Sequence, residues 1–196
     1  SADDSIYYFA KDNLEYQRLE KQFSEKKQWL EGVPKLKTIA QIFKERGGYE
    51  IIGSVMGSDL VGLEYVGPFD DLEAQNKPGG YPFVDEDLEK NDITSVKQHM
   101  VIDPGKDNIG NDIVVSGEGA GIVHMAPGCG NIDHKVGKTN NLINIAPLDE
   151  EAKFMDHFGW LHKKSATDPE TIDQIIADLK DRKFLVYVEK YPHVYP

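Results

Sequence analysis

From Tyr49 onward the chain consists of short apolar runs that Gly, Pro, Asp and Asn interrupt at close intervals. The runs are rich in Val, Ile and Tyr, which favour β-strands, and turn-forming residues separate them. They are YEIIGSVM at 49–56, LVGLEYV at 60–66, VKQHMVI at 96–102, DIVVS at 112–116, GIVHMA at 121–126, INIAPLD at 143–149 and FLVYVEK at 184–190. This pattern predicts a mixed α/β chain with an antiparallel β-barrel core and peripheral helices.

Helical patterns lie at the two ends of the chain. After a predicted strand at 5–10, apolar side chains recur at helical spacing from Asp12 to Gly32 and again from Leu36 to Gly48. Near the C-terminus, Asp168-Pro169-Glu170 provides a cap, a proline in the first turn and an early acid. The apolar residues that follow share one face, and they are Ile172, Ile175, Ile176 and Leu179.

Composition limits the partners and the compartment. The 196 residues contain 34 acidic and 22 basic side chains, and the net charge of −12 should repel a phosphate backbone at long range. No apolar run approaches the roughly 18 residues of a membrane span, and Cys129 is the only cysteine, so we expect a soluble, cytoplasmic protein without contact to a membrane. We expect residues 1–196 to form a single domain, with the polar, Pro/Gly-rich segment 67–95 as an exposed acidic excursion.

The stretch GAGIVHMAPGCGNIDHKVGK at 119–138 has the most unusual composition. Its end, Gly137-Lys138-Thr139, is similar to the end of a phosphate-binding P-loop, but the first glycine of that motif would fall at Ile132. The glycines at 117–121 alternate with other residues, which fits a tight hairpin better than a dinucleotide-binding turn.

Three further interpretations of this stretch remain open from the residues alone. His124, Cys129, Asp133 and His134 are all zinc ligands by type, although their spacing matches no standard zinc motif. Cys129 could act as a nucleophile paired with His124 or His134, although a small apolar cysteine is more often packed than reactive and no oxyanion-binding arrangement is visible. In the third, Asp133 begins a helix beside His124, and both residues serve structure only.

The run GEGAGIVHMAPGCGNIDHKVGK resembles the signature of the editing domain of isoleucyl-tRNA synthetases, members of the class I aminoacyl-tRNA synthetases. The family pattern is G-T-G-[IV]-V-H-x-A-P, followed six residues after the proline by an aspartate, and Pro127 and Asp133 have that spacing. The segments GSDLVGLEYVGPFD at 57–70 and LKDRKFLVYVEKYPHVYP at 179–196 are also similar to the family. The resemblance covers the chain from about Ile51 onward, and Pro127-Gly128-Cys129-Gly130 favours the isoleucyl over the valyl and leucyl members.

This resemblance implies a function. An editing domain with the barrel fold of the valyl, isoleucyl and leucyl enzymes would hydrolyse valine from tRNA(Ile) that carries it by mistake. Asp133 would be the catalytic-site residue that holds the α-ammonium of valine. The residues that bound the substrate would be Gly121, His124, Met125, Ala126 and Pro127. The expected partners are the acceptor end of tRNA(Ile) and the rest of the synthetase in cis, and the hydrolysis would use neither a metal nor a cofactor.

Some family features are absent. Ala120 replaces the usual threonine, and the threonine-rich strand T-T-x-P-W-T that lines the pocket does not occur. The ATP-binding signatures H-I-G-H and K-M-S-K-S do not occur either, so we expect ATP to bind a synthetic domain outside this chain, which would be an excised fragment of a larger synthetase. The alternative function is a non-catalytic module that contacts tRNA or a partner protein.

Overall fold

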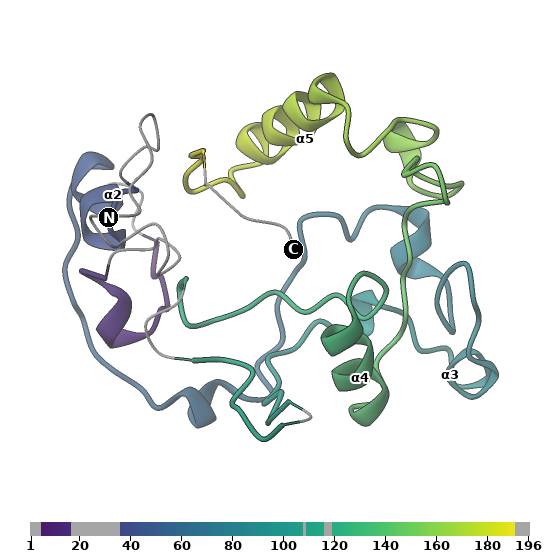
Figure 1. Ribbon diagram of the computed structural model, residues 1–196, viewed down its shortest axis with the longest axis horizontal. Coiled ribbons are helices and arrows are strands. Elements are labelled where there is room, and N and C mark those ends of the chain that lie inside the picture. Colours follow the sequence, from purple (N-terminus) through teal and green to yellow (C-terminus); the bar gives the residue numbers. More distant parts are fainter. Residues whose placement is uncertain (1–4, 17–35, 108, 116–118, 191–196) are drawn as a thin grey trace. The chain divides into compact units, whose positions relative to one another are not determined.

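The computed structural model describes residues 5–16, 36–107, 109–115 and 119–190, and it divides the chain into two compact units. The first unit comprises Ser1–Val55, Gly105–His124 and Tyr187–Pro196, and the second comprises Met56–Pro104 and Met125–Val186. Within the described residues the α-helices are α2 (Ile39–Glu45), α3 (Glu86–Lys90), α4 (Asn131–Thr139) and α5 (Pro169–Asp181), as Figure 1 shows. Short 3-10 helices are η1 (Lys11–Asn13), η3 (Gly57–Leu60), η4 (Glu73–Asn76), η5 (Val96–Gln98) and η6 (Gly159–Leu161).

The predicted antiparallel β-barrel is wrong for the described part of the chain, which contains isolated β-bridges but no strand, sheet or barrel. A strand needs a ladder of consecutive backbone hydrogen bonds to a partner, and the predicted runs lack such ladders here. Several of them have no regular secondary structure and expose their apolar side chains: Ile51 is 68% exposed and Val188 is 50% exposed. High β-propensity alone therefore did not identify strands, because it does not supply a pairing partner.

Two of the predicted runs do lie side by side in the second unit. Glu64 and Met100 form an antiparallel bridge, and three backbone hydrogen bonds of 2.8–3.0 Å join residues 62–65 to 99–101. The contact stops after one bridge, because η3 precedes it on one segment and η5 on the other. In this pair of segments, the predicted antiparallel pairing is formed in part.

The first unit has an aromatic core around Phe43 on α2. The rings of Tyr7, Phe9 and Tyr49 have centroids 4.8, 6.3 and 6.2 Å from the ring of Phe43. Thr38 begins α2 with a capping box, in which its side chain accepts from the Gln41 amide and the Gln41 side chain accepts from the Thr38 amide. The predicted helix at 36–48 is confirmed, whereas most of the one predicted from Asp12 to Gly32 lies outside the described residues.

The second unit has its own hydrophobic core, formed by Leu72, Ala74, Phe158 and Leu161. Partly buried side chains surround this core, among them Phe69, Tyr81, Ile145, Phe154, Met155 and Ile175. The helix predicted after Asp168 is confirmed as α5, whose N-terminus is capped by the Asp168 side chain. Ile175 packs against the core, but Ile172 is 42% exposed, so only part of the predicted apolar face is covered.

The segment 67–95, expected to be an exposed acidic excursion, supplies buried residues to the second unit. Leu72 and Ala74 belong to the core, and Leu88 of α3 is 6% exposed. Its acidic side chains point outward, as with Glu86 and Asp87, which pair with Lys90 at the surface. The polar composition of this segment thus reflects its exposed side chains and did not predict that its few apolar residues are buried.

Among the helices of the described residues, none combines the length and the apolar character that crossing a membrane requires.

Candidate functional site

The candidate site is built around the turn at residues 126–129. The Cys129 amide donates to the Ala126 carbonyl at 2.9 Å, which closes a turn with Pro127 and Gly128 at its centre. A Cβ atom on Gly128 would lie 1.9 Å from the Ile145 carbonyl oxygen. The turn therefore lies directly against the backbone of residues 144–145, and the close contact requires glycine at position 128.

Helix α4 follows this turn and is joined to it by Asp133. The Oδ2 atom of Asp133 accepts a 3.0 Å hydrogen bond from the Ala126 amide. Gly130 is the N-cap residue of α4 and has no side chain to cap the helix, so Asp133, in the first turn, is the acidic group at this positive end. Within the described part of the chain Oδ1 of Asp133 has no hydrogen-bond partner, so this half-buried carboxylate can accept a further donor.

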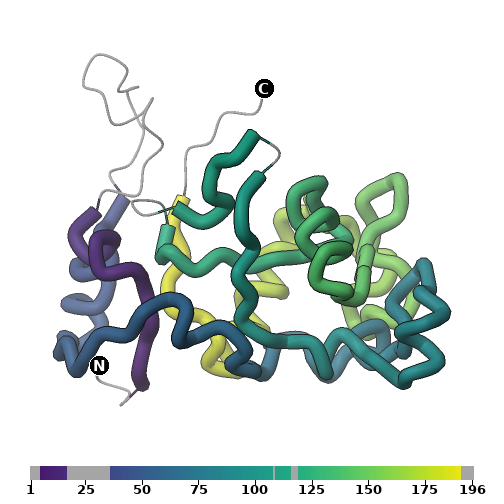
Figure 2. The backbone as a smooth tube through the Cα atoms, turned by 90° about the horizontal axis from the view of Figure 1, so that it is seen from below, coloured from purple at the N-terminus to yellow at the C-terminus, as the bar shows by residue number. Residues whose placement is uncertain are grey.

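Two more contacts hold α4 against the turn. The Nδ1 atom of His134 lies 3.2 Å from the Pro127 carbonyl oxygen. One helical turn further, a Cβ atom on Gly137 would lie 2.7 Å from Cβ of Pro127, so the proline ring packs against bare helix backbone. Together these contacts fix Ala126 and Pro127 relative to α4, and Figure 2 shows the green coil of α4 in the backbone trace.

The other residues expected to bound a substrate are distributed over both units. Met125, Ala126 and Pro127 are half-buried in the second unit together with Asp133. His124 is exposed and belongs to the first unit. Gly121, also in the first unit, has φ +73°, and a Cβ atom there would lie 2.3 Å from Cβ of Ala10, so its lack of a side chain serves local packing.

Cys129 does not have the properties of an activated nucleophile. Its side chain is exposed, yet partial desolvation raises the pKa of the thiol, and the nearby Asp133 carboxylate raises it further. A raised pKa reduces the fraction of reactive thiolate at neutral pH. Across the residues that the structure describes, no group of three or more His, Cys, Asp and Glu side chains is placed to hold a metal ion.

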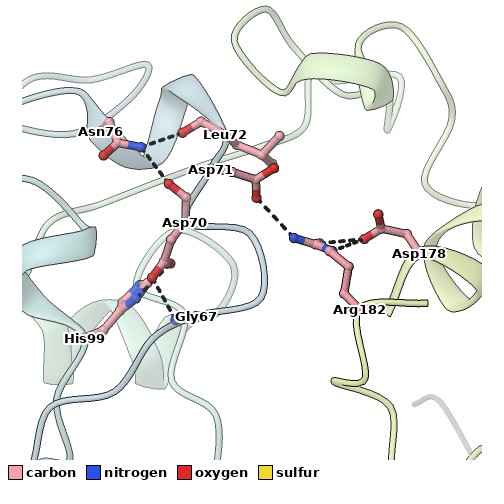
Figure 3. Close-up of polar contacts among 8 residues, drawn as sticks. All are labelled: Gly67, Asp70, Asp71, Leu72, Asn76, His99, Asp178 and Arg182. Atoms are coloured by element: carbon pink, nitrogen blue, oxygen red, sulfur yellow. Dashed lines mark hydrogen bonds and ion pairs between the residues drawn. The ribbon is translucent and has the colours of Figure 1, made fainter. Parts of the chain in front are cut away.

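A second polar cluster, which the sequence pattern did not identify, lies in the second unit (Figure 3). The Asp70 carboxylate accepts from the Gly67 amide at 2.8 Å, and its Oδ1 atom lies 3.0 Å from Nδ1 of His99, an ion-pair distance at an angle too poor for a hydrogen bond. The His99 ring stacks in parallel on Tyr65 at 5.2 Å, and burial, followed by the charge of Asp70, raises the pKa of Tyr65. The side chain of His99 is only 19% exposed. Its burial was not predictable because its partners lie about thirty residues away along the chain.

Arg182 makes a neighbouring set of contacts that is also drawn in Figure 3. It pairs with Asp178 one helical turn earlier and reaches Asp71 at 3.2 Å, which links the end of α5 to the segment before η4. The guanidinium also lies 5.2 Å from the centre of the Phe69 ring. These contacts join elements of the second unit and give Arg182 a structural role.

Comparison with curated proteins found isoleucine--tRNA ligases among the relatives of this chain. The chain is 29% identical over 189 residues to the isoleucine--tRNA ligase of Methanocaldococcus jannaschii. This match covers 94% of this chain and 16% of that protein. It is 30% identical over 149 residues to the enzyme of Sulfolobus acidocaldarius, with 76% of this chain and 12% of that protein covered. The enzyme of Aquifex pyrophilus is 34% identical over 149 residues, with 74% of this chain and 24% of that protein covered.

The chain therefore spans between 12 and 24% of the length of these relatives. No family model matches it, and no solved structure matches it significantly. The resemblance noted in the sequence is confirmed at the level of a segment of these ligases.

Proposed function

We infer that this chain, a relative of the isoleucine--tRNA ligases over most of its length, is an editing module that hydrolyses valine from mischarged tRNA(Ile). Isoleucine and valine differ by one methylene, which lets a single binding site discriminate between them by only about 1–3 kcal/mol. Isoleucyl-tRNA synthetases are the standard example of this limit. A second site that hydrolyses the smaller product corrects the remaining errors.

The observation that carries this proposal is the position of the Asp133 carboxylate. Its Oδ2 atom is held by the Ala126 amide, and its Oδ1 atom is left for another donor. A carboxylate that is already oriented by a backbone amide suits an α-ammonium group, because an ionised pair with fixed geometry forms a strong hydrogen bond. We propose that Asp133 anchors the amino group of the valyl ester.

The neighbouring residues would then bound the valine side chain. Ala126 and Pro127 are fixed against α4 by Asp133, His134 and Gly137, so they form a firm wall. We propose that Met125, which precedes them in the same motif and the same unit, extends this boundary. A rigid wall can reject an extra methylene, whereas a mobile one would adjust to it.

The proposed chemistry requires neither a metal nor a cofactor. A water molecule positioned beside the anchored ester attacks its carbonyl carbon, and the 2′- or 3′-hydroxyl of the terminal ribose leaves. The acceptor end of tRNA(Ile) is the proposed partner, together with the remaining parts of a ligase such as the longer relatives, where ATP would bind. A non-catalytic module that only contacts tRNA or a partner protein is the rival.

The test is a deacylation assay with the 196-residue chain. Valyl-tRNA(Ile) and isoleucyl-tRNA(Ile) are incubated separately with the chain and with buffer alone, and the loss of labelled amino acid is followed. We expect faster loss of valine than in buffer, with isoleucine spared. Binding of tRNA without any acceleration would favour the non-catalytic module and contradict the editing function.

A further inference from the structure

The contact between His134 and Pro127 determines which nitrogen of the histidine ring carries the proton. Nδ1 lies 3.2 Å from the Pro127 carbonyl oxygen, and a carbonyl oxygen can only accept a hydrogen bond. The ring must therefore donate from Nδ1. In the neutral ring the lone pair is then on Nε2, which is the arrangement found in histidines that act as bases.

His134 also differs from the other histidines of the second unit in the partner that it contacts. His99, His157 and His162 each lie 2.6–3.0 Å from a carboxylate, namely those of Asp70, Glu73 and Asp156. A carboxylate places a negative charge beside the ring, whereas a backbone carbonyl orients the ring without adding a charge. His134 is thus the histidine of this unit that is oriented through Nδ1 by a backbone carbonyl.

His134 contacts the same 126–129 turn as Asp133, the proposed anchor of the substrate. Asp133 and His134 are adjacent in the first turn of α4, and they contact adjacent residues of the same turn, Ala126 through its amide and Pro127 through its carbonyl. Both side chains therefore face the 126–127 backbone. His134 is half-buried, so the residue is not sealed from solvent.

We propose that Nε2 of His134 is the general base of the editing reaction, an inference that rests on the proposed function. Nε2 takes one proton from water while the water oxygen forms a bond to the ester carbonyl carbon. The bond between that carbon and the ribose oxygen then breaks, and the imidazolium returns the proton to the ribose oxygen. The products are valine and tRNA with a free hydroxyl, and His134 is restored to its neutral form.

The tautomer is tested without any activity measurement. Nitrogen-15 NMR of the chain, recorded above the titration range of histidine, about pH 5–8, reports which ring nitrogen carries the proton. His134→Gln assigns the signal. We expect a proton on Nδ1 and a bare Nε2, and the opposite tautomer would overturn the proposal because Nε2 could not accept a proton.

The catalytic role is tested by deacylation of valyl-tRNA(Ile) by the wild-type chain and by His134→Gln. The glutamine amide can still donate to the Pro127 carbonyl but cannot act as a base in this pH range. We expect a loss of about 100-fold or more in the rate above buffer, as for other general bases. The matched control is His162→Gln, which removes a surface histidine paired with Asp156 and should hydrolyse at the wild-type rate.

The pH dependence separates the possible outcomes. After subtraction of buffer hydrolysis, the wild-type rate should fall as the pH drops through the histidine range, and this dependence should disappear in a folded His134→Gln chain. If wild-type hydrolysis is insensitive to pH, or His134→Gln retains the rate, His134 is not the base and the editing function still holds. If the wild-type chain does not hydrolyse valyl-tRNA(Ile), the editing function is contradicted and the role of His134 with it.

Discussion

Close backbone contacts at two glycines decide how the 126–129 turn sits on its neighbours. Gly128 meets the Ile145 carbonyl and Gly137 meets the Pro127 ring, and neither position leaves space for a methyl group. Asp133 completes the attachment through the Ala126 amide. Each of these residues therefore fixes the geometry of the turn, whatever chemistry occurs beside it.

We expect Gly128→Ala to lower the free energy of unfolding by about 1–3 kcal/mol, because overpacking against a backbone carbonyl forces the chain to move. Gly53→Ala is the matched control, since a Cβ atom there meets nothing within 4 Å and its φ is not in the left-handed region. It should change stability by less than about 0.5 kcal/mol. Urea denaturation of both variants measures the difference, and equal midpoints would show that the 126–129 turn does not approach Ile145 as described.

The electrostatic contact between Asp133 and Cys129 gives a second prediction. Both desolvation and the Asp133 charge raise the pKa of the thiol, so the wild-type thiolate fraction near pH 8 is low. Asp133→Asn removes the charge, lowers the pKa and should increase the rate of alkylation by iodoacetamide severalfold. Alkylation followed by mass spectrometry at several pH values measures it, and an unchanged rate profile would mean that the carboxylate does not act on the thiol.

At the scale of elements, α2 and α5 were predictable because their signals are local, whereas α3, within 67–95, was not predicted. Asp168 with Pro169 marks the start of α5, and α2 begins after its cap Thr38, inside the apolar pattern predicted from Leu36 to Gly48. Strand pairing is not local: the pattern predicted an extended run at 60–66 but could not reveal that only Glu64 and Met100 form a bridge. The same distinction applies to the site, where Asp133 at the start of a helix was predicted and the burial of His99 beside Asp70 was not.

Capping at Asp168 is the basis of a prediction for α5. The Asp168 side chain accepts from the Glu170 amide at 3.1 Å, so Asp168→Ala leaves that donor without its partner. We expect a loss of about 0.5–2 kcal/mol in the free energy of unfolding. Asp173→Ala, an exposed acid within the same helix, is the control and should have a smaller effect. Thermal unfolding of the two variants compares them, and equal destabilisation would argue against the cap.

At the scale of the whole molecule, the described residues form two units, and the candidate motif passes from one to the other between His124 and Met125. Each unit has its own apolar core, around Phe43 in the first and around Leu72 in the second. The expectation of a single domain over 1–196 stays a prediction. The net charge of −12 works against tRNA binding, so we expect weak association with tRNA to limit catalysis by this chain. Variants should therefore be compared through kcat/KM.

The central claim, that Asp133 anchors the substrate ammonium for hydrolysis, is tested most directly by Asp133→Asn. The asparagine oxygen can still accept from the Ala126 amide, so the turn should remain attached to α4 while the charge is lost. Asp133→Ala removes both the acceptor for the Ala126 amide and the negative charge, and it should also lower the free energy of unfolding by about 1–3 kcal/mol. For the folded Asp133→Asn chain we predict that kcat/KM for valyl-tRNA(Ile) falls by about thirtyfold or more. This corresponds to a loss of about 2 kcal/mol in transition-state stabilisation. A folded Asp133→Asn chain that deacylates valyl-tRNA(Ile) at the wild-type rate would contradict the account.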